Sequence, residues 1–94
     1  MRSIENFTYI MLHRDPVDFR MSINGLGSIV QNAMNQDPFQ NALFIFCCKR
    51  KKRLKCLYWD KTGFALWYKK LEEDRFHWPS AKNDNIIYLN KQEL

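Results

Sequence analysis

The sequence predicts an α+β domain in which one main helix packs on a mostly antiparallel sheet of four or five strands. Three observations predict this fold: a β-prone run at residues 8–13, apolar residues at helical spacing from 19 to 35, and alternating apolar and polar residues after Pro38. The expected order of elements is β-α-β-β-β-β. The 94 residues suit a single domain spanning 1–94.

The predicted helix spans residues 19–35. Its apolar face follows the 3.6-residue period and consists of Phe19, Ile23, Leu26, Val30, Ala33 and Met34. Two starts are open: Asp15 as the cap with Pro16 in the first helical position, or Asp18 as the cap. Pro38 disfavours helical geometry at the residue before it, so the helix should end by then.

Two glycines lie inside this predicted helix. Gly25 and Gly27 each destabilise a helix by about 1 kcal/mol relative to alanine. We expect them where the helix approaches the sheet closely; contact with a ligand is the alternative.

The second half of the chain predicts an antiparallel meander. Leu54, Cys56 and Tyr58 should share one face of a strand, with Leu57 and Trp59 on the other. The turn at 60–63 should need a positive φ at its glycine. The expected strands cover residues 43–48, 53–59, 64–71 and 75–78, with a possible last strand at 86–89.

The C-terminal residues 90–94 look like the first turn of a helix. Asn90 would be its cap and Glu93 would occupy the third helical position. A one-turn helix is not stable alone, so we expect this segment to be frayed or to be the start of a truncated helix.

Positive charge is concentrated in one region. The net charge is +5, and residues 49–75 hold ten Lys or Arg against four Asp or Glu. Contact with nucleic-acid phosphates is one interpretation. A solubilising hairpin tip and a site for an acidic protein surface are the others. The candidate nucleic-acid-binding residues are Lys49, Arg50, Lys51, Lys52, Arg53, Lys55, Lys69 and Lys70.

Two further residues are candidates for binding a protein partner, Arg20 and Trp78. Arg20 also has a structural interpretation, as the ion-pair partner of Asp15 or Asp18. Core packing is the alternative for the aromatic residues of the strands.

The sequence contains no motif of catalytic residues, no metal-ligand spacing and no cofactor-binding motif. The three cysteines form no Cys-x-x-Cys pair, and nothing around Cys56 and His77 supports a nucleophile pair. We therefore expect a non-enzymatic protein. The longest apolar run, residues 42–48, is too short for a membrane span of about 20 residues, and the first six residues lack the apolar run of a signal peptide. A cytoplasmic protein without a membrane partner is expected.

Several segments of the chain resemble a known family. They are 17–26, 36–39, 43–46, 54–60, 63–72 and 75–79. They resemble TnpB, the accessory transposition protein of the Orf-two-like family of insertion-sequence sixty-six elements. The chain departs from that pattern at Cys47–Arg53, where the family usually has an Arg-rich connection with an Asp, and at Met21, where Lys is common.

The resemblance implies a protein of a bacterial mobile element that is encoded beside the transposase and needed for efficient transposition, a form of DNA recombination. It implies no catalytic residues. Two functions fit: an accessory factor that binds DNA phosphates non-specifically through the basic hairpin tip, or a module that binds the transposase without contacting DNA. DNA and the element-encoded transposase are thus the expected partners, and the oligomeric state stays open.

Overall fold

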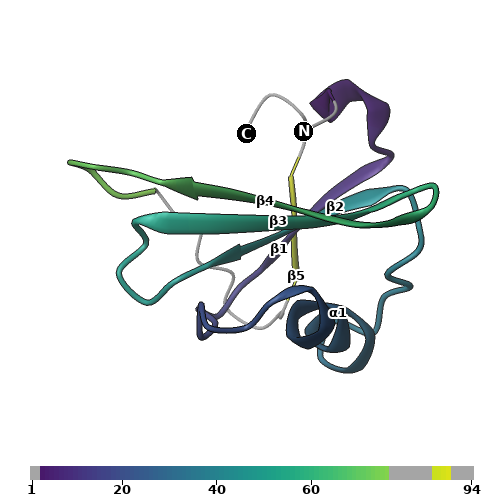
Figure 1. The fold of residues 1–94 in the computed structure, drawn as a ribbon, viewed down its shortest axis with the longest axis horizontal. Coiled ribbons are helices and arrows are strands. Elements are labelled where there is room, and N and C mark those ends of the chain that lie inside the picture. Colours follow the sequence, from purple (N-terminus) through teal and green to yellow (C-terminus); the bar gives the residue numbers. More distant parts are fainter. Residues whose placement is uncertain (1–2, 77–85, 90–94) are drawn as a thin grey trace.

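The computed structural model describes residues 3–76 and 86–89. It confirms the predicted fold class, because one α-helix packs on one face of a five-stranded, mostly antiparallel sheet (Figure 1). The elements are a 3-10 helix η1 (Ile4–Asn6), strand β1 (Tyr9–His13), helix α1 (Ile23–Asn32), and strands β2 (Ala42–Cys47), β3 (Arg53–Asp60), β4 (Gly63–Lys70) and β5 (Ile86–Leu89).

The strands are arranged in the order β4-β3-β2-β1-β5. β1 and β2 are parallel, because α1 connects them and returns the chain to the same end of the sheet. The pairs β2–β3, β3–β4 and β1–β5 are antiparallel. The meander predicted after Pro38 is therefore confirmed for β2, β3 and β4.

Both faces of the sheet are apolar. On the helix face, Leu26 and Val30 of α1 pack against Phe44 and Phe46 of β2 and Leu57 of β3. The members of the cluster on the opposite face include Phe7, Ile10, Leu43, Ile45, Cys56 and Tyr58. Because β2 is covered on both sides, all six of its residues are buried, and its sequence is continuously apolar rather than alternating.

The helix is shorter than predicted. It begins at Ile23 rather than at 19, and neither Asp15 nor Asp18 caps it. Ser22 occupies the cap position without a side-chain hydrogen bond. The carboxylate of Asp18 instead accepts the backbone N–H of Arg20, which favours a turn over a helix at this point.

The expectation that the two helix glycines lie where the helix approaches the sheet is wrong. A Cβ at Gly25 would lie 2.9 Å from Cε of Met21, so the close approach is to the segment before the helix and not to the sheet. A Cβ at Gly27 would meet nothing within 4 Å. Gly27 therefore faces open space.

Two details of the meander also differ from the prediction. In the turn between β3 and β4 the positive φ, 53°, belongs to Lys61, and Gly63 has none. Arg75 and Phe76 are not in a strand. The N–H of Phe76 donates to the carbonyl of Lys51, which binds this segment to the β2–β3 turn. The rest of the predicted strand 75–78, and the predicted helical turn 90–94, lie outside the described residues.

Candidate functional site

The basic connection between β2 and β3 is a tight, hydrogen-bonded turn. The N–H of Lys51 donates to the carbonyl of Cys48 (3.0 Å), and the N–H of Cys48 donates to the carbonyl of Arg53 (3.3 Å). Lys51 takes a positive φ of 60° to close the turn. The five successive cations are thus held by a defined backbone rather than by a loose loop.

A second set of hydrogen bonds holds this turn against the chain that follows β4. The N–H of Leu71 donates to the carbonyl of Lys52, and the N–H of Phe76 donates to that of Lys51, both over 2.7 Å. The turn is therefore anchored on both sides.

Part of the predicted basic set surrounds one hollow of about 240 Å³. The residues that line it are Cys48, Arg50, Lys52, Arg53, Tyr68 and Lys70. Arg53 and Lys70 meet there because they lie directly opposite each other in the β3–β4 register. Among the residues that the structure describes, no carboxylate lines the hollow. Within residues 3–76 and 86–89, the salt bridges are Arg14–Asp15 and Arg20–Asp18, so these four cations have no acidic partner there.

Arg53 contacts three side chains around the hollow, those of Cys48, Tyr68 and Phe19. Hydrogen bonds to the side chains of Cys48 and Tyr68 raise the pKa of its guanidinium. The guanidinium also lies 5.4 Å from the centroid of the Phe19 ring, a cation–π distance. These contacts place its charge at the wall of the hollow.

The thiol of Cys48 lies in the same wall. Burial raises its pKa, but hydrogen bonds from the backbone of Lys52 and Arg53, the side chain of Arg53 and the backbone of Arg50 outweigh burial and lower it to about 7. The neighbouring thiols differ, since burial raises the pKa of Cys47 to about 11 and that of Cys56 to about 12. Backbone amides that converge on one atom form a concavity suited to negative charge.

All three cysteines are free, and the described part of the chain holds no group of His, Cys, Asp or Glu that could bind a metal. In the same residues no helix has the length and apolar content needed to cross a membrane.

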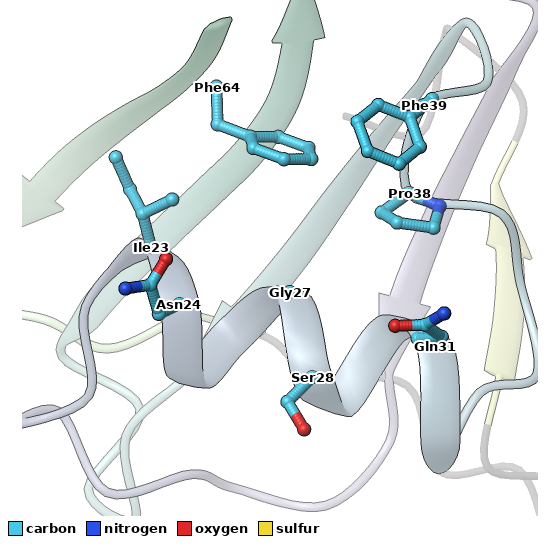
Figure 2. A pocket seen from close by; sticks show the side chains of 8 residues that line it. All are labelled: Ile23, Asn24, Gly27, Ser28, Gln31, Pro38, Phe39 and Phe64. Carbon is cyan, nitrogen blue, oxygen red and sulfur yellow. The ribbon is translucent and has the colours of Figure 1, made fainter.

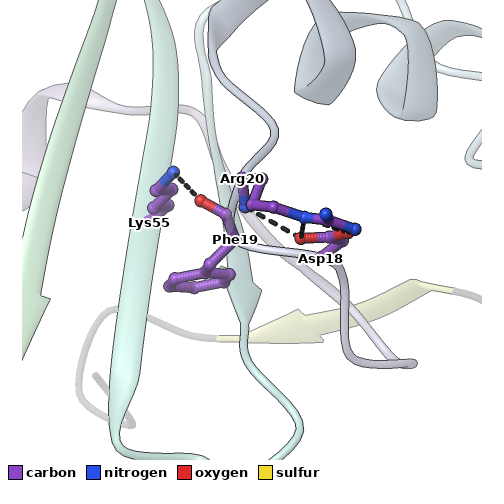
Figure 3. A network of polar contacts seen from close by, with 4 residues as sticks. All are labelled: Asp18, Phe19, Arg20 and Lys55. Atoms are coloured by element: carbon purple, nitrogen blue, oxygen red, sulfur yellow. Dashed lines mark hydrogen bonds and ion pairs between the residues drawn. The ribbon is translucent and has the colours of Figure 1, made fainter.

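The structure separates Lys55 from the hollow. Its Nζ donates to the backbone carbonyl of Phe19 at 2.8 Å and lies 5.1 Å from the centroid of the Phe19 ring (Figure 3). It also donates to the backbone carbonyl of Met21, again at 2.8 Å. Lys55 therefore holds the segment before α1 against β3.

Arg20 and Asp18 form a local ion pair on that same segment (Figure 3). Two guanidinium nitrogens donate to the Asp18 carboxylate, the shorter contact being 2.6 Å. The hydrogen bond from the Arg20 side chain lowers the pKa of Asp18 to about 2. The Arg20 side chain is 91% exposed, so the pair is a surface feature.

The remaining predicted residues are more dispersed. Lys69 lies opposite Leu54 in the register, on the face of the sheet away from α1. Lys49 is exposed and Lys51 is half-buried, and neither lines the hollow. Trp78 lies outside the described residues. Of the eight basic candidates, the hollow thus brings together Arg50, Lys52, Arg53 and Lys70.

Sequence reasoning missed a second hollow, also of about 240 Å³, at the opposite end of the β3–β4 pair. It lies between α1, the loop after it and β4, and is lined by Ile23, Asn24, Gly27, Ser28, Gln31, Pro38, Phe39 and Phe64 (Figure 2). Phe39 is 56% exposed, and its ring centroid lies 4.9 Å from that of Trp59 and 5.4 Å from that of Phe64. The sequence offered one signal for this groove, a glycine inside the helix at Gly27, where a Cβ would meet nothing within 4 Å.

A family model described as "IS66 Orf2 like protein" matches residues 8–94. The chain belongs to this family. The resemblance of the sequence segments is thereby confirmed. The IS66 Orf2-like family implies an accessory role in insertion-sequence transposition, and it is not a family of known enzymes.

Two relatives of this family member come from Sinorhizobium fredii (strain NBRC 101917 / NGR234). "Uncharacterized protein y4jC" is 40% identical over 85 residues, which are 90% of the chain and 72% of that protein. "Uncharacterized protein y4hO" is 33% identical over 69 residues, 73% of the chain and 60% of that protein. No solved structure matches the chain.

Proposed function

We propose that this IS66 Orf2-like protein assists transposition by holding DNA phosphates in the basic hollow beside the β2–β3 turn. One observation carries the proposal: Arg50, Lys52, Arg53 and Lys70 line one hollow, and no carboxylate of the described part of the chain lines it with them. Cations held close together repel one another, and a polyanion relieves that repulsion while releasing its own counterions.

The same geometry favours binding without sequence readout. The cations stand on a turn and two strand ends, and α1 is not among the elements that line the hollow. Reading bases in the major groove requires a helix or a two-stranded ribbon inserted there. Affinity on the order of 10⁻⁴–10⁻⁶ M at physiological salt is therefore expected, falling as salt rises.

The test compares two triple variants that remove equal charge. Arg50→Ser/Lys52→Ser/Lys70→Ser empties the hollow of three cations, and Lys49→Ser/Lys61→Ser/Lys69→Ser removes three that do not line it. If all three lining cations contact phosphates, the slope of log affinity against log salt should weaken by about 2.7 in the first variant and little in the second. Arg53 is kept because its hydrogen bonds also hold the turn.

Two results would reject the proposal. Equal slope changes in both variants would mean that net charge acts without a site. Absence of binding by the wild-type chain to duplex and single-stranded DNA at about 50 mM salt would reject direct DNA contact.

The second candidate function is binding of the element-encoded transposase without contact to DNA. The groove beside Phe39 favours it, because large exposed apolar residues beside a hollow are common in protein interaction sites. A pull-down with the transposase, with and without nuclease, tests it. Phe39→Ser should weaken nuclease-resistant capture, and Tyr9→Ser, at an aromatic residue of similar exposure on strand β1, should not.

A further inference from the structure

Within the described residues, strand β4 is an edge of the sheet with no strand on its side away from β3. It is at one end of the strand order and is eight residues long, whereas β5, at the other end, has four. From Gly63 to Tyr68 it carries neither a charged residue nor a proline. Natural sheets usually protect an edge strand by making it short or by placing charges or proline on it, because unpaired backbone groups bind other strands.

The register shows which residues of β4 point their backbone groups outward. The N–H of Leu71 donates to the carbonyl of Lys52 directly opposite, so this pair is hydrogen-bonded. Hydrogen-bonded and non-bonded pairs alternate along an antiparallel ladder. The N–H and C=O groups of every second residue therefore point away from β3, and these residues are Phe64, Leu66, Tyr68 and Lys70. Within the described residues, no strand pairs with this side of β4 (Figure 1).

We propose that a second copy of this chain binds here by placing its own β4 antiparallel to the first, with Trp67 opposite Trp67 of the second copy. This register engages all four outward residues of both strands: Leu66 pairs with Tyr68, and Phe64 pairs with Lys70, of the other copy. About eight backbone hydrogen bonds then form, since each of the four pairs exchanges two. The interface is self-complementary, as a two-fold dimer requires.

The charges of β4 favour this pairing. Its two lysines stand at the C-terminal end, and its N-terminal half is uncharged. In the antiparallel register Lys69 faces Ala65, and Lys70 faces Phe64, of the second copy. No like charges meet within the eight-residue ladder, whereas a parallel arrangement would place the lysines beside one another.

The dimer would present both basic hollows on one side. The two-fold axis is perpendicular to the sheet, so the α1 helices of both copies cover the same face. Lys70 lies opposite position 64 of the other copy, which separates the two lysine positions by about 20 Å along the strands. The dimer does not depend on the proposed DNA binding, but two linked phosphate sites would bind one DNA molecule more tightly than one site.

Sedimentation velocity over a range of concentrations tests the dimer. The wild-type chain should move from monomer to dimer mass as its concentration rises. Tyr68→Pro removes an outward N–H in both copies, whereas Tyr68→Thr removes the same ring and keeps the N–H. The proline variant should weaken dimerisation by about 10-fold or more relative to the threonine variant. Circular dichroism of both variants checks that the monomer remains folded.

Disulfide cross-linking tests the register. Positions 65 and 69 of the two copies form a non-hydrogen-bonded pair, whose Cα separation of about 4.5 Å suits a disulfide. The double variant Ala65→Cys/Lys69→Cys should form a covalent dimer under mild oxidation, and each single variant should not. The native cysteines are buried, and the wild-type chain measures their background.

Three outcomes would overturn the proposal: a wild-type chain that stays monomeric up to about 1 mM, equal dimerisation by the two Tyr68 variants, or cross-linking of a single-cysteine variant as strong as that of the double variant. These three measurements use the wild-type chain and variants at Tyr68, Ala65 and Lys69, and none of them needs DNA. The two proposals can therefore fail separately.

Discussion

The two ends of the β3–β4 pair have opposite character although they belong to one hairpin. At one end Arg53 faces Lys70, and the cations surround a hollow that no carboxylate lines within residues 3–76 and 86–89. At the other end Trp59 faces Phe64, and their rings pack with centroids 5.0 Å apart. Burial of apolar rings stabilises the fold, while clustered like charges do not. The hairpin therefore separates a stabilising end from an end suited to bind a ligand.

The largest expected loss of stability is at the aromatic end. Phe64→Ala should lower the free energy of unfolding by about 2–3 kcal/mol, somewhat less than for a fully buried phenylalanine, because Phe64 is half-buried. Urea denaturation measures this change, and the salt slope of DNA binding should stay unchanged. Phe39→Ala, at a ring that is 56% exposed, is the control and should lower the free energy of unfolding by less. A loss at Phe64 below that at Phe39 would contradict the comparison.

A smaller loss of stability is expected from Lys55→Met. This change leaves the carbonyls of Phe19 and Met21 without their donor, and an unsatisfied, partly buried carbonyl costs about 1–3 kcal/mol. Hydrogen exchange should accelerate in residues 17–22 before it does in the strands. Lys70→Met, at the hollow, is the matched control. If both variants lose the same stability, Lys55 has no special structural role.

Substitutions at the basic end of the hairpin should cause almost no loss of stability. Arg50→Ser/Lys52→Ser/Lys70→Ser should change the free energy of unfolding by less than about 0.5 kcal/mol, because exposed side chains without acidic partners add little to stability. Urea denaturation at about 50 mM salt, where charge repulsion is least screened, measures this. Destabilisation by more than about 1 kcal/mol would show that the cations hold the turn together.

The smallest effect concerns the protonation of Cys48. Its pKa is lowered from 9.0 to about 7, so its stabilising contribution is complete above the unfolded pKa near 9 and is lost as the pH falls through 7. The rate of alkylation of the native chain should rise with a midpoint near pH 7. Arg53→Gln should move that midpoint upward, and Cys48→Ser should abolish the reaction. A midpoint near 9 in the wild-type chain would contradict the hydrogen bonding described for this thiol.

The strands could be predicted because successive residues of a strand face opposite sides of the sheet, so the residues that are buried together recur at every second position of the sequence. Leu54, Cys56 and Tyr58 alternate with residues of the other face, and the structure confirms this arrangement. The start of the helix could not be predicted in the same way. Both Asp15 and Asp18 are suitable caps. The Asp18 carboxylate instead accepts the backbone N–H of Arg20, and residues 19–22 lie outside the helix.

The candidate site was predictable as a run of charge but not as a geometry. Lys49–Arg53 is evident in the sequence, and the separation of Lys69 from Lys70 follows from strand alternation. The partners of Lys55 are 34 and 36 residues away in the sequence, so only the fold reveals them. The contacts of the Cys48 thiol with backbone amides and the groove beside Phe39 also depend on loop conformations that no local pattern encodes.

The strand order also has a consequence for folding. β2, β3 and β4 are joined by short turns, so their pairing closes small loops and can form early. β1 instead pairs with β2 across the whole of α1, and with β5 near the other end of the chain. During synthesis β1 must therefore wait for β5 before both of its neighbours are present. The meander should act as the folding nucleus, and substitutions in β1 should mainly accelerate unfolding.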